Sequence, residues 1–171
     1  QFGQMEVFVL NNVSIFDGAD WGKSCMAEFA LTVGDILKVK GSAILSVRPD
    51  KTVALAAGIM KNRRIGILMV AEESGEVVGL LSERDIVRAV AIHGDGVAQV
   101  PVREIMTKRM VVCRPSDEAT SVMRTMQNGR FRHMPVMDEG AFTGIISIGD
   151  ILEHLLAHEQ LEYEQTILSN F

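Results

Sequence analysis

One segment of this chain occurs twice, and the repeat limits the folds that the chain can adopt. The heptapeptide "GLLSERD" at 79–85 returns as "GIISIGD" at 144–150, with glycine, serine and aspartate in the same three places. The match extends upstream, so that residues 33–90 align with residues 102–156 with only short losses in the second copy. Other paired positions are Pro49 with Pro115, Met60 with Met126, Asn62 with Asn128 and Val33 with Val102. Such a repeat predicts two copies of one small unit, packed together.

Both copies show the same succession of hydrophobic patterns. Each opens with a short apolar run that ends at Arg-Pro, residues 43–47 and 110–113, which predicts a strand stopped by proline. An apolar stripe with helical spacing follows. The stripe consists of Val53, Ala56, Ala57 and Met60 in the first copy and of Ala119, Val122, Met123 and Met126 in the second. Two extended runs separated by a polar turn come next, and a second helix begins at Ser82 or Ser147. Each copy is therefore expected to form a strand, a helix, two strands and a helix.

These patterns predict an α/β (α+β) fold made of two tandem repeats. We assign residues 32–93 to the first repeat, 94–101 to a linker and 102–158 to the second repeat. Residues 1–31 form an unassigned N-terminal extension, and residues 159–171 form a helical tail. Neither repeat alone can bury its helical stripes and its sheet face well, so we expect the two to pack side by side.

The composition argues against several classes of protein. The 171 residues carry a net charge of -5, which disfavours a general duplex-binding surface because phosphate affinity normally needs clustered lysine and arginine. The chain shows neither an apolar run of about 18 residues, as a membrane span needs, nor a basic-then-apolar leader. The two cysteines, Cys25 and Cys113, have no metal-ligand spacing around them. We therefore expect a cytoplasmic protein whose cysteines are packing residues.

The Ser-x-x-Asp sequences at the two strand-to-helix junctions have two interpretations. In the first, Ser82 and Ser147 cap their helices, and Asp85 and Asp150 bond back to form capping boxes. In the second, each junction binds a nucleotide, because a helix N-terminus attracts phosphate and a carboxylate can accept hydrogen bonds from a ribose diol. The glycine three residues before each serine would then leave room for a ligand to approach the strand. Capping and binding can coexist, and the duplication of the whole junction favours binding.

The order of the elements and the segments "RHMPVMDEG" and "GIISIGDIL" resemble the CBS domain, the small module named after cystathionine β-synthase. The segments "NRRIGILMV" and "GLLSERDIVRAV" of the first copy resemble it equally well, and the resemblance covers residues 33 to 158 or so. It implies two copies packed about a pseudo-twofold axis, an arrangement known as a Bateman module. It also implies an adenosine-containing ligand (AMP, ADP, ATP, S-adenosylmethionine or NAD) and a tendency to form dimers.

The resemblance further implies how two ligand pockets are assembled. Each pocket takes the strand entries of one copy and the Ser-x-x-Asp junction of the other, with apolar residues enclosing adenine and the aspartate holding the ribose. One pocket would combine Ile44, Leu45, Ile65, Gly66 and Ile67 with Ile145, Ser147, Gly149 and Asp150. The other would combine Val111, Val112, Phe131, Arg132 and His133 with Leu80, Ser82, Arg84 and Asp85.

The charges of the two expected pockets differ. The Asp85 pocket gathers Arg84, Arg132 and His133, whereas the Asp150 pocket has glycine or isoleucine at the matching places. Guanidinium groups bind phosphate oxygens through paired hydrogen bonds. We therefore expect the Asp85 pocket to grip phosphate, and the Asp150 pocket to bind more weakly or to hold a nucleoside-like portion. The alternative for each arginine is a solvated surface position, and His133 could equally be a half-buried structural histidine.

No catalytic constellation is evident, so we expect the chain not to be an enzyme. The repeated serine lacks a partnering His-Asp arrangement, and neither cysteine lies in a nucleophile motif. His154 and His158 are spaced so that they could share a helix face with Glu153 and bind a metal. A solvated helix face is favoured because no third ligand is evident, and no metal is predicted.

Three functions from different classes remain. The favoured one is a stand-alone adenine-nucleotide sensor that forms a homodimer and regulates an unknown partner protein. The main alternative is a structural dimerisation module with vestigial pockets. The third, a nucleic-acid-binding protein, is disfavoured by the acidic balance of the chain.

Overall fold

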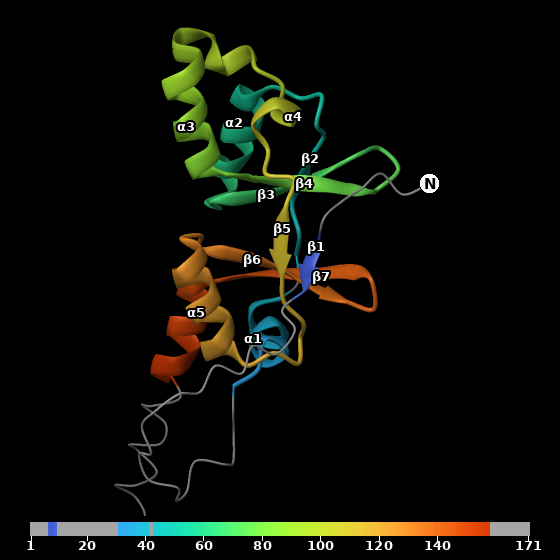
Figure 1. Ribbon diagram of the computed structural model, residues 1–171, viewed down its shortest axis with the longest axis vertical. Helices are drawn as coiled ribbons and strands as arrows, with labels where there is room; N and C mark the ends of the chain where they lie inside the picture. The colour runs from blue at the N-terminus through green and yellow to red at the C-terminus, as the bar shows by residue number, and fades with distance from the viewer. Residues whose placement is uncertain (1–6, 10–30, 42, 158–171) are drawn as a thin grey trace, which may run out of the picture. The chain divides into compact units, whose positions relative to one another are not determined.

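The computed structural model describes residues 7–9, 31–41 and 43–157, which fold as two compact units (Figure 1). The first unit contains residues 43–110, and the second contains residues 31–41 and 111–157. The short strand β1 (Val7–Val9) pairs with β5 (Met110–Val112). The helical tail expected over 159–171, most of the N-terminal extension, and the residues Cys25 and His158 lie outside the described residues.

The first unit is a small sheet covered by helices. Strand β2 (Ser46–Val47) runs parallel to β3 (Ile67–Ala71), and β3 pairs antiparallel with β4 (Val77–Ser82). The helices α2 (Val53–Arg63) and α3 (Glu83–His93) lie on the same side of the β3–β4 hairpin (Figure 1). The chain then passes through the 3₁₀-helix η1 (Gly94–Gln99) and the short helix α4 (Val102–Ile105). The buried core of the unit consists of Val47, Ala56, Met60, Leu68, Val70, Leu81 and Val102.

The second unit repeats this plan. It contains α1 (Val33–Lys40), α5 (Ala119–Gly129), the antiparallel hairpin of β6 (His133–Asp138) and β7 (Ala141–Ser147), and a last helix over 148–157. Cys113, directly after β5, bridges in parallel to Val136 of β6. The buried core consists of Val33, Ile36, Cys113, Ala119, Val122, Met126, Met134, Val136, Ile146 and Ile151.

The backbone repeats in detail between the two copies. Helices α2 and α5 both end at an arginine in the left-handed region, Arg64 with φ 54° and Arg130 with φ 56°. Both hairpins are irregular at the same place, after Val70 in the first copy and after Val136 in the second. The expected order of strand, helix, strand, strand, helix is therefore confirmed for each copy, as is the mixed α and β fold.

The two copies exchange their first segments. The first segment of each copy packs in the unit that the rest of the other copy forms. Helix α1 begins the first copy in sequence, yet the Val33 and Gly34 N–H groups donate to the carbonyls of Asp117 and Pro115, at 2.9 and 2.8 Å. Reciprocally, α4 begins the second copy, and the Val102 and Arg103 N–H groups donate to the carbonyls of Lys51 and Pro49, at 2.8 and 3.0 Å. The acceptors are matching positions of the two copies, so the exchange is itself repeated.

This exchange also places apolar side chains in the core of the other copy. Val33 and Ile36 of α1 belong to the buried core of the second unit. Val102 of α4 belongs to the buried core of the first unit. The compact units therefore cut across the copies that the sequence shows, because each core is completed by one segment from the other copy.

The structure fills the space beside the two repeated glycines with protein. A Cβ atom on Gly79 would lie 2.9 Å from the carbonyl oxygen of Thr107. A Cβ atom on Gly144 would lie 2.9 Å from a terminal carbon of Leu37. The expectation that these glycines leave room for a ligand is therefore wrong on the side to which a Cβ atom would point, because the exchanged segments occupy that space.

We expect Gly79→Ala to destabilise the protein more than Gly144→Ala. The Thr107 carbonyl is fixed by reciprocal backbone hydrogen bonds with Leu80, at 2.8 and 2.9 Å, so it cannot move away from a new methyl group. The Leu37 side chain can change rotamer. Overpacking against the fixed group should cost about 1–3 kcal/mol. Urea unfolding of the two variants measures the difference, and equal costs would contradict this account of the two contacts.

Candidate functional site

Both strand-to-helix junctions are capping boxes. The N–H and hydroxyl of Ser82 donate to Oδ2 of Asp85 at 2.9 and 2.6 Å, and the Asp85 N–H donates back to the Ser82 hydroxyl at 3.4 Å. At the second junction, Ser147 makes the same two bonds to Oδ2 of Asp150 at 2.7 and 2.6 Å. The Asp150 N–H donates to the Ser147 hydroxyl at 3.1 Å. The capping interpretation of the repeated serine and aspartate is thus confirmed.

A third capping box of the same kind begins α1. The Thr32 hydroxyl donates to Oδ2 of Asp35 at 2.6 Å, and the Asp35 N–H donates to the Thr32 oxygen at 3.2 Å. A hydrogen bond from Lys38, followed by those from Thr32, lowers the pKa of Asp35 to about 2. The box at α1 shows that this pairing of hydroxyl and carboxylate starts a helix by itself, so capping does not distinguish a ligand site.

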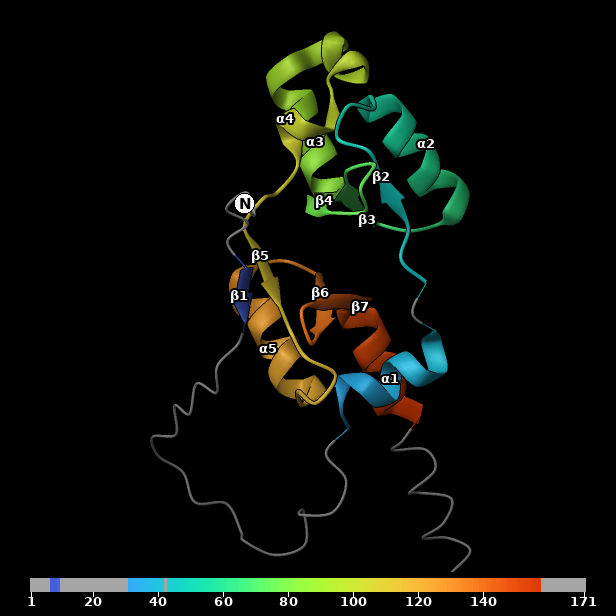
Figure 2. The same cartoon turned by 90° about the vertical axis from the view of Figure 1, so that its right-hand side faces the viewer.

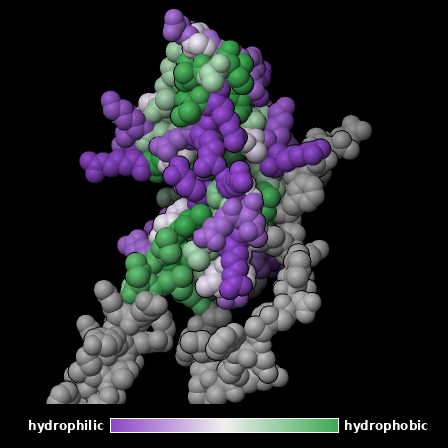
Figure 3. Space-filling model, turned by 60° about the vertical axis from the view of Figure 1, so that its left-hand side comes forward, coloured by the Kyte–Doolittle hydropathy of each residue, from purple (hydrophilic) through white to green (hydrophobic). Residues whose placement is uncertain are grey.

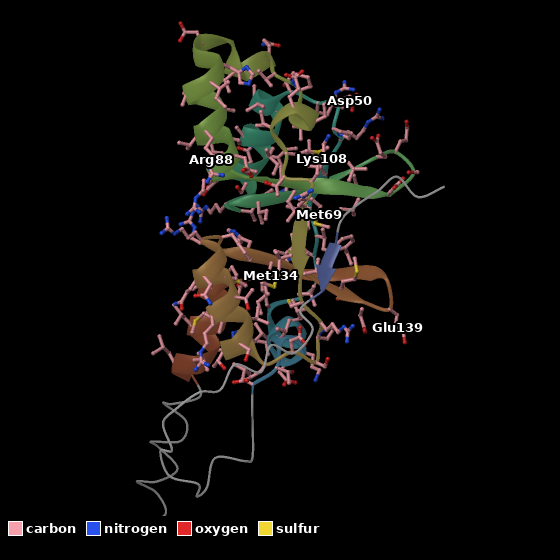
Figure 4. The ribbon with its side chains drawn as sticks, viewed as in Figure 1. Asp50, Met69, Arg88, Lys108, Met134 and Glu139 are labelled. Atoms are coloured by element: carbon pink, nitrogen blue, oxygen red, sulfur yellow. The ribbon has the colours of Figure 1, made fainter. Side chains whose placement is uncertain are left out.

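The two repeated carboxylates keep an oxygen that the caps do not use. The bonds that each aspartate accepts from its serine end on Oδ2, whereas the Oδ1 atom of Asp85 lies 4.0 Å from Nη1 of Arg88, which projects from α3 (Figure 4). The Asp85 and Asp150 side chains are 12% and 18% exposed, so neither carboxylate is sealed in a core. Because a carboxylate offers about four acceptor positions, each could cap its helix and accept a further hydrogen bond.

Lys40 is a residue of the second junction that the sequence did not reveal. It is the last residue of α1, which the exchange places beside β7 and the last helix (Figure 2). Its ammonium donates to Oδ2 of Asp150 at 2.5 Å and to the Ile145 carbonyl at 3.1 Å. No local pattern marks it, because Lys40 and Asp150 are 110 residues apart in the chain.

The ion pair sets the charge of this junction. Burial of Asp150 acts to raise its pKa, but the hydrogen bonds from Lys40 and Ser147 outweigh it and hold the pKa below the usual value. The carboxyl is therefore ionised at neutral pH. Because the folded-state pKa is depressed, the stability that this group contributes is present above the unfolded-state pKa of about 3.9 and is lost as the pH falls through the folded-state pKa.

In the first unit, several of the predicted site residues meet where β3 begins and β4 ends. Ile67 pairs directly with Ser82, and the Glu83 N–H donates to the Gly66 carbonyl at 3.1 Å. Leu80 is buried and Arg84 is exposed. The remaining residues of this group are half-buried: Ile44, Leu45, Ile65, Gly66, Ile67, Ser82 and Asp85.

The second unit brings the matching residues together in the same way. His133 pairs with Ser147, and the Ile148 N–H donates to the Arg132 carbonyl at 3.0 Å. The ring of Phe131 lies against Gly129, where a side chain would leave it no space. Val112 is buried, Arg132 and Gly149 are exposed, and the others are half-buried: Val111, Phe131, His133, Ile145, Ser147 and Asp150.

Each pocket implied by the resemblance takes its residues from both units, so its assembly stays a prediction. The structure shows, for each unit separately, the residues that this unit would contribute to the two pockets. Within each unit, the strand entry and the Ser-x-x-Asp junction of the same copy are adjacent at the start of the hairpin's helix. Such an edge offers helix N–H groups, a carboxylate and apolar side chains, which together are suited to a ligand with a ribose, a phosphate and a flat base.

Two other features bear on the class of protein. Within residues 7–9, 31–41 and 43–157, no three or more side chains of histidine, cysteine, aspartate or glutamate gather as a metal site would require. His154 instead places Nδ1 2.9 Å from the Asp150 carbonyl oxygen. In the same described part of the chain, no helix is long and apolar enough to cross a bilayer.

Comparison with known families identifies the repeat. The family model described as CBS domain matches the chain twice, at residues 33–92 and 102–157. The chain belongs to the CBS domain family. Pairs of CBS domains are regulatory modules, generally non-catalytic, that often bind adenine nucleotides, and the two matched ranges make this chain such a pair.

Known relatives have the same two-copy organisation. A CBS-domain containing protein from Agrobacterium tumefaciens is 39% identical, with a TM-score of 0.71 over 74% of this chain and 95% of its own. The CBS domain-containing protein YhcV of Bacillus subtilis is 30% identical over 74% of this chain and 89% of its own. A hexameric CBS-CP12 protein from bloom-forming cyanobacteria is 32% identical, with a TM-score of 0.62 over 71% of this chain and 69% of its own.

Proposed function

We propose that this CBS pair is a non-catalytic sensor that binds an adenine nucleotide, namely AMP, ADP, ATP or NAD, between its repeats. The observation that carries the proposal is the repeated junction, in which a partly exposed aspartate stands at a helix N-terminus with one oxygen outside the cap. The ribose hydroxyls would donate to Asp85 or Asp150, and the phosphate would lie near the helix N–H groups. The family's regulatory role supports this function.

A sensor of this kind acts through a partner or a second copy. We propose that the chain forms homodimers or larger assemblies through its helices, where apolar side chains are exposed. Figure 3 shows hydrophobic residues at the surface of each unit. The exposed large apolar side chains include Val87, Val90 and Ile92 of α3 in the first unit, and Leu152 and Leu156 of the last helix in the second. A related CBS-CP12 protein is hexameric, which supports assembly. The regulated target would be a cytoplasmic protein without the involvement of nucleic acid or membrane.

The test is a titration of the chain with AMP, ATP, NAD and S-adenosylmethionine. A true ligand should raise the unfolding temperature progressively, because a ligand that binds the folded state at a hundred times its Kd stabilises it by about 2.7 kcal/mol. Asp85→Ala and Asp150→Ala should each weaken binding at their own site by about tenfold or more, since each removes hydrogen bonds to a charged group. The larger loss is expected for Asp85→Ala if its pocket grips the phosphate.

Asp35→Ala is the matched control, because it removes a capping box of the same geometry from α1. It should lose stability as the other two variants do, yet keep the affinity for the nucleotide. If no ligand stabilises the chain at any concentration, the structural dimerisation module with vestigial pockets is the better description. Equal affinity in all three variants and the parent would remove the ribose role of both aspartates.

A further inference from the structure

The Asp150 carboxylate is already occupied by a group of the protein. Its Oδ2 atom accepts the two capping bonds from Ser147 and a third bond from the Lys40 ammonium at 2.5 Å. The ammonium also donates to the Ile145 carbonyl at 3.1 Å. Lys40 is 36% exposed, so it is within reach of solvent and of an incoming ligand.

The Oδ1 atom of Asp150 is outside the cap, but a ribose diol that binds both oxygens of this carboxylate has to compete with Lys40 at Oδ2. The hydroxyls are neutral, so they replace an ion pair by hydrogen bonds in which only the carboxylate is charged, and they leave an ammonium without its counterion. A phosphate group can take over that ammonium, whereas an uncharged nucleoside has nothing to offer it. The cost of displacing Lys40 is therefore smaller for a ligand that carries phosphate.

We propose that Lys40 is an internal competitor for Asp150, and that it makes this site select phosphorylated nucleotides over neutral nucleosides. The inference rests on the proposed function, and it adds to that function a named specificity residue. It also changes the expected character of the site, since Lys40 supplies a cation to the junction for which the sequence predicted none.

The position of Lys40 gives the displacement a further effect. Lys40 ends α1, Gly41 follows with φ 86°, and the chain then passes from the second unit to the first between residues 42 and 43, one of the places where it crosses between them. The ion pair thus fastens the end of α1 to the last helix shortly before this crossing. A ligand that draws Lys40 away from Asp150 removes that attachment.

The experiment compares AMP and adenosine by calorimetric titration in an Asp85→Asn background, which limits binding to the Asp150 site. Lys40→Met removes the ammonium and keeps most of the stem. It should strengthen adenosine binding by about threefold to tenfold and weaken AMP binding, so that the preference for AMP shrinks by about tenfold or more. Lys38→Met is the matched control, because Lys38 lies in the same last turn and pairs with Asp35 at 2.8 Å instead. It should leave both affinities as they are in the parent.

A second measurement follows the Asp150 carboxyl by carbon NMR without ligand. Lys40→Met should raise its titration midpoint, and Lys38→Met should not. If Lys40→Met does not fold, Lys40→Gln serves in its place. Binding of both ligands with an unchanged preference in the Lys40 variant would overturn the competitor role and leave the proposed function standing. If none of these variants binds but the chain with Asp85 intact does, the competitor role is overturned and the proposed function stands; if the chain with Asp85 intact does not bind either, both proposals are overturned.

Discussion

Ile36→Ala is expected to destabilise the second unit by about 2–5 kcal/mol, the usual cost of truncating a large buried aliphatic side chain. Ile36 is 0% exposed and lies in the core of that unit with Met126, Met134 and Ile146, although in sequence it belongs to the first copy. Hydrogen exchange measured by mass spectrometry should show lost protection in β6 and β7 and retained protection in β3 and β4.

Val39→Ala on the same helix is the control, because Val39 is 77% exposed and its truncation should change the free energy of unfolding by less than about 0.5 kcal/mol. An Ile36 variant that loses protection in β3 and β4 first would contradict the exchange of segments between the copies.

Val102→Asp is expected to unfold the first unit. Val102 is 0% exposed in the core formed by Leu68, Val70 and Leu81, and a carboxylate placed there would have to be buried unpaired or protonated. Either state should cost more than about 3 kcal/mol, which is a large part of the stability of a small domain. Loss of exchange protection in β3 and β4 at neutral pH measures the effect.

The neighbouring position provides a control for charge. Arg103 is exposed, so Arg103→Asp adds a carboxylate to α4 without burying it, and it changes the net charge by two where Val102→Asp changes it by one. This variant should keep the protection of the first unit, and it separates the effect of burial from that of negative charge. Equal damage from both substitutions would show that α4 is sensitive to charge and not to packing.

The order of elements was predictable because the signals for it are local. A helical stripe such as Val53, Ala56 and Met60 buries one face wherever its partner lies, and all three residues are buried. The prolines and the glycine-containing turns likewise stop strands by their own backbone restrictions. The Ser-x-x-Asp caps form within four consecutive residues, so the sequence contains the whole interaction.

The exchange of first segments was not predictable from the same patterns. The apolar positions of α1, Val33 and Ile36, indicate that one face is buried, but not against which copy. Since the two copies are similar, either core would accept that face. The role of Lys40 at Asp150 was missed for this reason, because the two residues are distant in sequence and meet only when α1 joins the second copy.

The occupied space beside Gly79 and Gly144 has the same origin. In a sequence, a glycine in a strand indicates close approach by something, and a ligand and a protein segment give the same signal. Here Thr107 and Leu37, both from exchanged segments, are the groups that approach.

Each of the two cores contains a segment from the other copy. This arrangement bears on how such a chain could evolve and on what happens when it is cut between the copies. A fragment with only one copy would lack the segment that completes its core in this structure, and its own first segment would lose the core that it enters here. Two identical fragments could satisfy each other by swapping these segments, which is a low-cost route to a dimer. Joining two such genes end to end would then give one polypeptide with the same contacts. Cutting it between the copies should accordingly yield fragments that are stable only as pairs.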